Sequence, residues 1–573
     1  MRVPRYGPGF ERKLPLTAGD ALVLLLLAAL IALGARLALR VPAVVAGRGI
    51  SLEPSALPWY ALFSVGRMAL AYLLSLVFSL VYGYAAARSR GARAVLMPLL
   101  DVLQSVPILS FLPVVLLSFT AVLPEAFAAE LASIVLIFTS QAWNMTFSFY
   151  QSVRTTPQEL REAAAVFRLG PWLRFRTLEL PFAAPGLVWN SMMSWSGGWF
   201  FLMAAEIFVV GKRDFRLPGL GSYLHEASAA SDWRAIALGV ATLVLIVVLL
   251  DLVIWRPVLA WSEKFKLELT GNDEPRESHL LDLVRRSWLL DRLTAGTLGP
   301  LADWIDRRLQ RRAAVTPPVE SEGEGPPGLL ARATLVLLAA LALYGTWRAL
   351  RLVSALTAAE WLALGSGLAA TLLRVTIALA ITLAWTVPLG VLIGSSRRWA
   401  AWLQPVVQIL ASIPATALFP VLVVLLLGLP GGLSIAAVLL MLMGTQWYLL
   451  FNVIAGAAAI PEDLRLTTDL LRLSGRDRWR ALTLPAIFPF LITGMITASG
   501  GAWNASVVAE HVTFGERVYD TPGVGALIAE ATAHGNYPML TAATLALVLV
   551  VVLINRFLWL RLYRRAEERY RME

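Results

Sequence analysis

The residue types that usually carry out covalent chemistry or bind metal ions are sparse in this 573-residue chain. It has no cysteine, and its four histidines are scattered along the sequence, at His225, His279, His511 and His534. A metal centre or a nucleophile with its base needs such residues close together, so we predict no catalytic residue and no metal site. The phosphate-binding pattern G-x-x-x-x-G-K-[ST] is also absent, and we therefore expect no cofactor in this chain.

Two carboxylates, Glu206 and Glu510, end long apolar segments and lie 304 residues apart. If these apolar segments cross a membrane, an ionisable group at that depth is by default a functional hypothesis, and Arg67 and Arg374 are conceivable partners. The alternative, which we favour, is that both carboxylates form structural ion pairs near the outer membrane interface. For Asn144, Asn190 and Asn504 we favour a polar role along a path, because amides that face lipid are costly.

The composition indicates the elements that must position these residues. Hydrophobic residues make up 58% of the chain and charged residues 15%, which is too apolar for a soluble protein. Apolar segments of about 20 residues are long enough to cross a membrane as helices, whereas a barrel would show shorter alternating segments. The net charge of +11 fits basic cytoplasmic loops better than nucleic-acid binding. The first apolar run superficially resembles a signal peptide, but its length favours a transmembrane helix.

The chain contains an internal duplication. TPQELREAAAVFRLG…LELP, ending at Pro181, is repeated 304 residues later by IPEDLRLTTDLLRLS…LTLP, ending at Pro485. SGGWFFLMAAE (196–206) matches SGGAWNASVVAE (499–510) with one extra residue after the glycine pair. Upstream, LQSVPILSFLP matches LASIPATALFP at an offset of 307. Leucine-rich helices resemble one another by chance, but chance does not keep Pro, Gly, Trp and Glu in register, so we infer two fused modules.

Each module is expected to contain about six membrane-spanning helices. The predicted spans are 19–40, 60–87, 96–121, 127–150, 182–210 and 234–260, then 329–353, 362–394, 402–428, 431–456, 486–510 and 537–560. The sequence thus predicts an all-α polytopic membrane protein, with modules at 1–260 and 329–573. A cytoplasmic linker at 261–328 is expected to hold amphipathic helices and a disordered tether. Arginine-rich segments, including both termini, fall on one side, which the positive-inside rule makes cytoplasmic.

A charged segment between the fourth and fifth spans of each module predicts a short amphipathic helix. Thr156-Pro157-Gln158-Glu159 indicates a capping box with proline at the first helical position, and Gly170-Pro171 ends the helix. The apolar stripe has small residues at its centre: Leu160, Ala163, Ala164 and Phe167 in the first copy, and Leu464, Thr467, Thr468 and Leu471 in the second. A helix this short is marginally stable alone and is expected to pack against a partner. One alternative is a helix that rests on lipid headgroups. Two copies in matched positions favour the other, in which both helices are docking elements that are used as a pair.

Here the chain resembles a known family. EAA, a turn and LELP before a membrane span are similar to the cytoplasmic coupling motif of binding-protein-dependent ABC importer permeases. DVLQSVPILSFLPVVLL, WNSMMSWSGGWFFLMAAE and LPGLGSYL resemble the nitrate, sulfonate, taurine and bicarbonate branch of that family. The resemblance covers nearly the whole chain outside the linker, as two permease modules in tandem. It implies a type I importer permease fold, with each coupling helix in a groove of an ATPase subunit.

The resemblance also implies site residues. The expected ATPase-coupling residues are Glu159, Arg161, Glu162, Ala163, Ala164, Phe167, Arg168 and Gly170, with Glu462, Asp463, Arg465, Thr467, Thr468, Leu471 and Gly475. The glycine expected soon after EAA is replaced by Arg168 and by Arg472, and the second EAA has become Leu466-Thr467-Thr468. We therefore do not expect equivalent docking sites. The expected translocation path includes Asn144, Asn190, Ser194, Trp195, Ser196 and Glu206, with Ser499, Trp503, Asn504 and Glu510.

The implied function is the permease subunit of an ATP-driven importer in the inner (plasma) membrane. The solute would be small, an anion such as nitrate, a sulfonate or taurine, or bicarbonate. Two separate ABC ATPase subunits would carry ATP and Mg²⁺, and a periplasmic or lipid-anchored binding protein would deliver the solute, so this chain is not expected to be an enzyme. The alternative is a secondary carrier of the major facilitator type. Its loop motif G-x-x-x-D-R-x-G-R-R is only partly matched by GYAAARSRGAR (83–93), which lacks the aspartate.

Overall fold

The computed structural model describes residues 49–265 and 343–570, apart from residues 89, 106, 211–212 and 515–516, and also Leu25 and Ala340. The predicted span at 19–40 except Leu25, about half of the one at 329–353 and the linker beyond residue 265 therefore lie outside the described residues. The boundaries predicted for the two modules remain expectations.

The first module consists almost entirely of helices. They are α2 (Leu57–Arg88), α3 (Arg90–Ser105), α4 (Leu112–Thr120), α5 (Glu125–Thr155), α6 (Gln158–Val166), α7 (Pro171–Arg174), α8 (Leu180–Glu206), α9 (Leu220–Ala229), α10 (Trp233–Leu250) and α11 (Arg256–Glu263). Short 3₁₀ turns occupy η1 (Pro54–Ala56) and η2 (Ile108–Phe111), and π-helical turns occupy η3 (Phe175–Glu179) and η4 (Asp251–Trp255). Strands β1 (Val209–Val210) and β2 (Arg213–Asp214) form an antiparallel hairpin after α8.

The second module repeats this order. Its helices are α16 (Ala358–Ser395), α17 (Arg397–Ser412), α18 (Ala415–Leu426), α19 (Gly432–Ala458), α20 (Glu462–Leu470), α21 (Gly475–Arg478), α22 (Leu484–Ala509), α23 (Val524–His534), α24 (Tyr537–Ile554) and α25 (Leu560–Tyr570). The π turns recur at η6 (Trp479–Thr483) and η7 (Asn555–Trp559), each 304 residues after its counterpart. Strands β3 (His511–Phe514) and β4 (Arg517–Asp520) form the second hairpin. The duplication inferred from the sequence is thus present in the local geometry.

Six helices in the described part of the chain are long and apolar enough to cross a membrane. They run over Pro54–Arg88, Trp233–Glu263, Ala358–Ser395, Gly432–Ala458, Gly475–Ala509 and Tyr537–Ala566. The 31-residue α5 and the 27-residue α8 hold the places in the first module that α19 and α22 hold in the second. The prediction of an all-α polytopic membrane protein with a tandem repeat is confirmed.

Two details of the sequence prediction were wrong, and one feature of the fold was missed. The spans expected at 96–121 and 402–428 are each broken, before Ile108 and before Ala415, because Pro107 and Pro414 adopt extended backbone and cannot continue a helix. The two short hairpins were not predicted. No extra residue interrupts α22, since Pro181 with Pro485 and Glu206 with Glu510 share the 304-residue offset; Gly197 therefore corresponds to Gly501.

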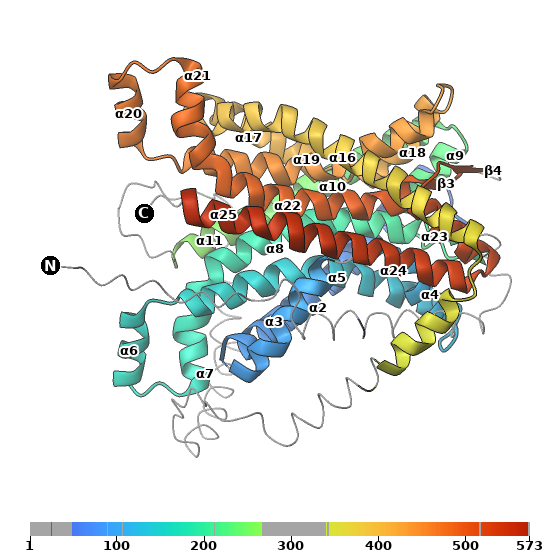
Figure 1. The fold of residues 1–573 in the computed structure, drawn as a ribbon, viewed down its shortest axis with the longest axis horizontal. Coiled ribbons are helices and arrows are strands. Elements are labelled where there is room, and N and C mark those ends of the chain that lie inside the picture. Colours follow the sequence, from blue (N-terminus) through green and yellow to red (C-terminus); the bar gives the residue numbers. More distant parts are fainter. Residues whose placement is uncertain are drawn as a thin grey trace.

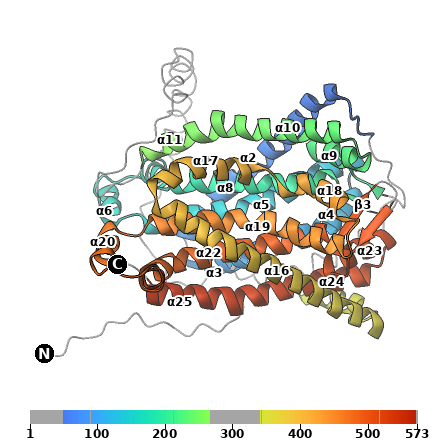
Figure 2. The same cartoon turned by 90° about the horizontal axis from the view of Figure 1, so that it is seen from above.

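The long helices lie side by side, and the short elements gather at their two ends (Figure 1). Both views place α6 and α20 at one end, and α9, α23 and the β3–β4 hairpin at the other (Figure 2). Within each module the extensive packing is between α2, α5 and α8, or between α16, α19 and α22. The largest buried core joins the modules, because Val114 and Phe215 of the first pack into the same cluster as Leu440 and Trp503 of the second.

Candidate functional site

The two short helices α6 and α20 end in the same way. After α6 the amide of Leu169 donates to the carbonyl of Ala164 and that of Arg168 to Ala165, the paired bonds of a Schellman motif. Arg168 takes the left-handed conformation (φ 49°), as does Arg472 after α20 (φ 48°). Glycine is the residue that adopts this conformation without steric cost. The arginines thus stand at the positions where the resemblance led us to expect glycine.

An arginine fixes each short helix to the preceding long helix. Arg161 Nη2 donates to the carbonyls of Val153 (3.0 Å) and Arg154 (2.8 Å) at the end of α5. Its counterpart Arg465 donates to Ala457 (2.6 Å) at the end of α19. These carbonyls lie at helix C-termini, where positive charge is favourable. Both arginines therefore orient α6 and α20.

The exposed faces of α6 and α20 differ from the predicted stripe. Ala164 is buried against the chain itself, with 5% of its surface exposed, and so is Thr468 with 8%. Two residues of the predicted stripe, Phe167 (75%) and Leu471 (66%), are exposed, and so are their neighbours outside it, Val166 (79%) and Leu470 (83%). Leu464 and Leu466 are also exposed. The small side chains of Ala164 and Thr468 allow each helix to pack closely against the rest of the chain, and the large residues at the end of each helix face outward.

The capping box predicted for α6 is absent. Pro157 occupies the N-cap position, and the Thr156 hydroxyl donates back to the carbonyls of Ser152 and Val153 instead of capping the new helix. The other predicted coupling residues are distributed as follows: Glu159, Glu162, Ala163, Phe167, Arg168, Asp463, Thr467, Leu471 and Gly475 are exposed, Gly170 is half-buried, and the Glu462 side chain is not described. Most of the predicted set thus lies on the surface.

At the opposite end a buried ion pair joins three helices of the first module. The carboxylate of Glu206 accepts from Arg67 Nη1 (2.8 Å), the Ser64 hydroxyl (2.7 Å) and the Gly221 amide (2.8 Å) in the first turn of α9. A carboxylate is favoured at such a helix N-terminus. Arg67 also forms a two-bond pair with Glu130 (2.6 and 2.8 Å). Glu206 is completely buried.

The second module repeats this cluster with one carboxylate fewer. Glu510 accepts from Arg374 Nη1 (2.8 Å), the Thr371 hydroxyl (2.8 Å) and the Gly525 amide (2.8 Å). Arg374 Nη2 donates to Thr521 Oγ1 (2.8 Å), and Ser434 replaces Glu130. A Cβ at Gly219 or at Gly523 would overlap the carboxylate of Glu206 or Glu510, which explains the glycines of PGLG and PGVG. Arg67 and Arg374 are the partners the sequence suggested.

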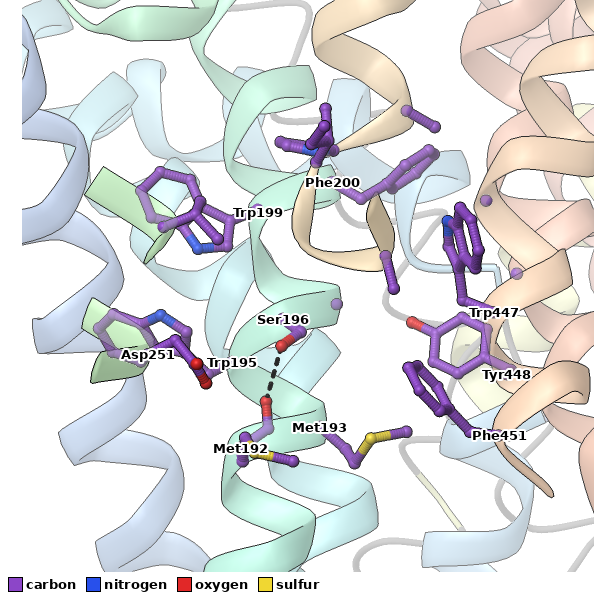
Figure 3. Close-up of a pocket in the computed structure, with 18 of the residues that line it drawn as sticks. Met192, Met193, Trp195, Ser196, Trp199, Phe200, Asp251, Trp447, Tyr448 and Phe451 are labelled. Carbon is purple, nitrogen blue, oxygen red and sulfur yellow. Dashed lines mark hydrogen bonds between the residues drawn. The ribbon is translucent and has the colours of Figure 1, made fainter. Parts of the chain in front are cut away.

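A cavity of about 150 Å³ lies between the modules, near the middle of α8 and α19. Met193, Ser196 and Phe200 of α8 lie across from Trp447, Tyr448 and Phe451 of α19, and the lining extends around α8 to Trp195 and Asp251 (Figure 3). Trp255 also belongs to the lining. Two hydrogen bonds join the modules beside it. The Leu109 amide donates to Asn504 Oδ1 (3.2 Å), and the Thr416 hydroxyl donates to the Phe200 carbonyl (3.1 Å).

The structure brings only part of the predicted path together. Trp195, Ser196 and Asn504 line the cavity. Glu206 and Glu510 lie in the buried ion pairs, Asn190 donates to Ser148, and Asn144 is exposed on α5. Ser194, Ser499 and Trp503 are buried among packed helices and do not line it. The sequence analysis missed Tyr448 and Phe451, which no motif marks.

Comparisons with known proteins agree with this architecture. The family described as "Binding-protein-dependent transport system inner membrane component" matches the chain twice, at residues 75–255 and 386–571. A nitrate import permease protein of Leptolyngbya laminosa is 30% identical over 188 residues, covering 33% of this chain and 64% of that protein. A bicarbonate transport system permease protein of Synechococcus elongatus is 29% identical over 194 residues (34% and 66%). A putative aliphatic sulfonates transport permease protein of Bacillus subtilis is 25% identical over 169 residues (30% and 58%).

These alignments are partial for both partners. The chain spans just under two thirds of the first of these relatives, and each alignment covers about one third of this chain. Because one module accounts for such a length, the two family matches fit the tandem duplication. The comparisons give no support to a carrier of the major facilitator type.

Proposed function

Because the chain belongs to the family of binding-protein-dependent transport system inner membrane components, we propose that it is the permease subunit of an ATP-driven ABC importer. It is a multi-pass membrane protein of two permease modules, with boundaries that we place at 1–260 and 329–573. The transported solute is a small anion of the kinds named for its relatives, nitrate, bicarbonate or a sulfonate. It crosses the inner membrane by alternating access, and both termini are cytoplasmic.

The observation that carries this proposal is the pair of short helices at one end of the molecule. α6 and α20 lie beyond the ends of the long helices (Figure 1). Two neighbouring large apolar residues are exposed at the end of each, Val166 with Phe167 and Leu470 with Leu471. Exposed apolar side chains outside a membrane span favour a protein partner. Two such helices, each fixed by an arginine, suit two ATPase subunits that bind ATP and Mg²⁺ and hydrolyse the ATP.

The proposed mechanism follows from the rigidity of these attachments. A pull on α6 is transmitted through Arg161 to α5 and through η3 to α8, and a pull on α20 passes through Arg465 to α19 and through η6 to α22. ATP-driven closure of the ATPase pair would bring α6 and α20 together and change the packing of α8 against α19 around the cavity. A solute-binding protein would deliver the solute at the end that holds α9 and α23.

Purification in mild detergent with the products of neighbouring genes tests the proposal. We expect an ATPase to co-purify and reconstituted vesicles to take up solute only when ATP is present on the side of α6 and α20. Uptake that follows an ion gradient without ATP would refute the importer and restore the carrier alternative.

A further inference from the structure

The cavity between α8 and α19 lies where the proposed path would cross the middle of the membrane. Both modules form its wall, because Tyr448 of α19 reaches the backbone of α8: a Cβ added at Gly197 would lie 2.7 Å from the Tyr448 hydroxyl oxygen. Gly444 and Gly501 also border the cavity and bring α19 and α22 close together. A change in the packing of the modules would therefore change this cavity directly.

The lining has an unusual composition for a site that binds a small inorganic anion. It is rich in aromatic side chains, with Trp189, Trp195, Trp199, Phe200, Trp447 and Phe451 among its residues. The described lining includes no lysine, arginine or histidine, and its one charged side chain, Asp251, forms an ion pair with Arg256 (3.0 Å). Any anion would lose hydration here without gaining a positive charge, which is unfavourable. Nitrate and bicarbonate have no apolar part to offset this cost, whereas an anion with an apolar body gains free energy when that body is buried.

Two indole groups in the lining offer hydrogen bonds that the described part of the protein does not use. Trp195 and Trp255 are 7% and 6% exposed, and neither Nε1 atom has a hydrogen-bond partner there. Their rings contact each other edge to face, with centroids 5.8 Å apart. Buried donors are normally paired, so an acceptor oxygen on a ligand would be favoured beside them.

The cavity volume sets the size of the ligand. A dry, apolar protein cavity of about 150 Å³ holds one benzene ring, and the volume here is ≈ 150 Å³. Aromatic walls favour a flat ring through offset or edge-to-face contacts. We propose that the solute carries a flat apolar body the size of a benzene ring and an oxyanion that accepts from indole N–H groups, as in an aromatic sulfonate. This substrate class rests on the function proposed above.

Binding of 4-fluorobenzenesulfonate to the full-length permease in nanodiscs, followed by ¹⁹F NMR, tests the substrate class. We expect the probe to bind and to be displaced by benzenesulfonate. Methanesulfonate, which has the anion without the ring, should compete at least about tenfold less well, and nitrate and bicarbonate should not compete. Displacement by nitrate or bicarbonate at comparable concentrations would overturn the inference.

Matched variants locate the binding. Ser196→Phe fills the cavity and should weaken probe binding more than about tenfold, whereas Ser366→Phe, at an exposed serine of α16 with the same kind of bond to its own helix, should leave it unchanged. Trp195→Phe replaces the indole by a smaller aromatic ring without an N–H and should weaken binding about tenfold. Wild-type binding by both Ser196→Phe and Trp195→Phe would overturn the assignment.

Binding of the ATPase to the same nanodiscs separates the two proposals. If the ATPase binds and the aromatic probe does not, the substrate class is wrong and the importer stands. If the probe binds and no ATPase does, the importer is wrong. Loss of the probe signal as the phospholipid content is raised would instead assign the cavity to a lipid chain and refute the proposal.

Discussion

Phe167 provides a direct test of the docking surface, because 75% of its surface is exposed at the end of α6. A phenylalanine buries about 200 Å² when fully covered, so about 150 Å² is available to a partner. At about 25 cal/mol per Å² this corresponds to about 4 kcal/mol, of which association realises about half after its entropic costs. Phe167→Asp should therefore weaken ATPase binding by about 2 kcal/mol, or roughly 30-fold.

The assay is the dissociation constant of the ATPase subunits for the permease in nanodiscs. Phe167→Leu, which keeps an apolar side chain, should stay within about threefold of wild type. Val122→Asp changes an exposed apolar residue in the turn after α4, before α5, and should have no effect. The same affinity for Phe167→Asp and wild type would refute the assignment of this face to the ATPase.

Three further changes test how the site is held. Gly219→Ala places a methyl group against the Glu206 carboxylate and should destabilise the protein by about 1–3 kcal/mol. The control is Gly365→Ala, where nothing lies within 4 Å of the added methyl group. Equal melting temperatures for the two variants would contradict the packing argument. Arg374→Met leaves Glu510 buried and unpaired and should cost about 3–5 kcal/mol in thermal unfolding. The double variant with Glu510→Leu should recover much of that loss, and failure to recover would show that the charge is not the cause. Arg161→Met removes the half-exposed arginine that fixes α6, so we expect a loss of only about 1 kcal/mol in stability but a clear loss of ATP-dependent uptake; normal uptake would show that this arginine does not transmit motion.

Much of the fold could be predicted because the two modules repeat the same pattern of residues. Pro, Gly and Glu recur at a fixed offset, and the length of an apolar segment is enough to predict a membrane-spanning helix. The breaks at Pro107 and Pro414 were missed because the apolar residues continue across them. The hairpins were missed because two to four residues per strand give too little alternation to detect.

The site was less predictable for two physical reasons. Helical spacing identifies an apolar stripe on α6 but does not show whether the stripe packs against the rest of this protein or against a partner. Ala164 packs against the rest of this protein. Likewise, the partnership of Glu206 with the amide of Gly221 depends on a hairpin between them. PGLG and PGVG are separated by the same 304 residues as Glu206 and Glu510. This shared offset was the signal that could have linked each glutamate to the glycines that follow it.

The central claim is that α6 and α20 approach each other when ATP binds to partner subunits. The chain has no cysteine, so spin labels can be placed at the exposed, repeat-equivalent positions by Ala163→Cys and Thr467→Cys without other changes. We predict that the distance between the labels, measured in the complex with the ATPase, shortens on ATP binding and lengthens again after hydrolysis. A distance that ATP leaves unchanged in a complex active in transport would contradict the account.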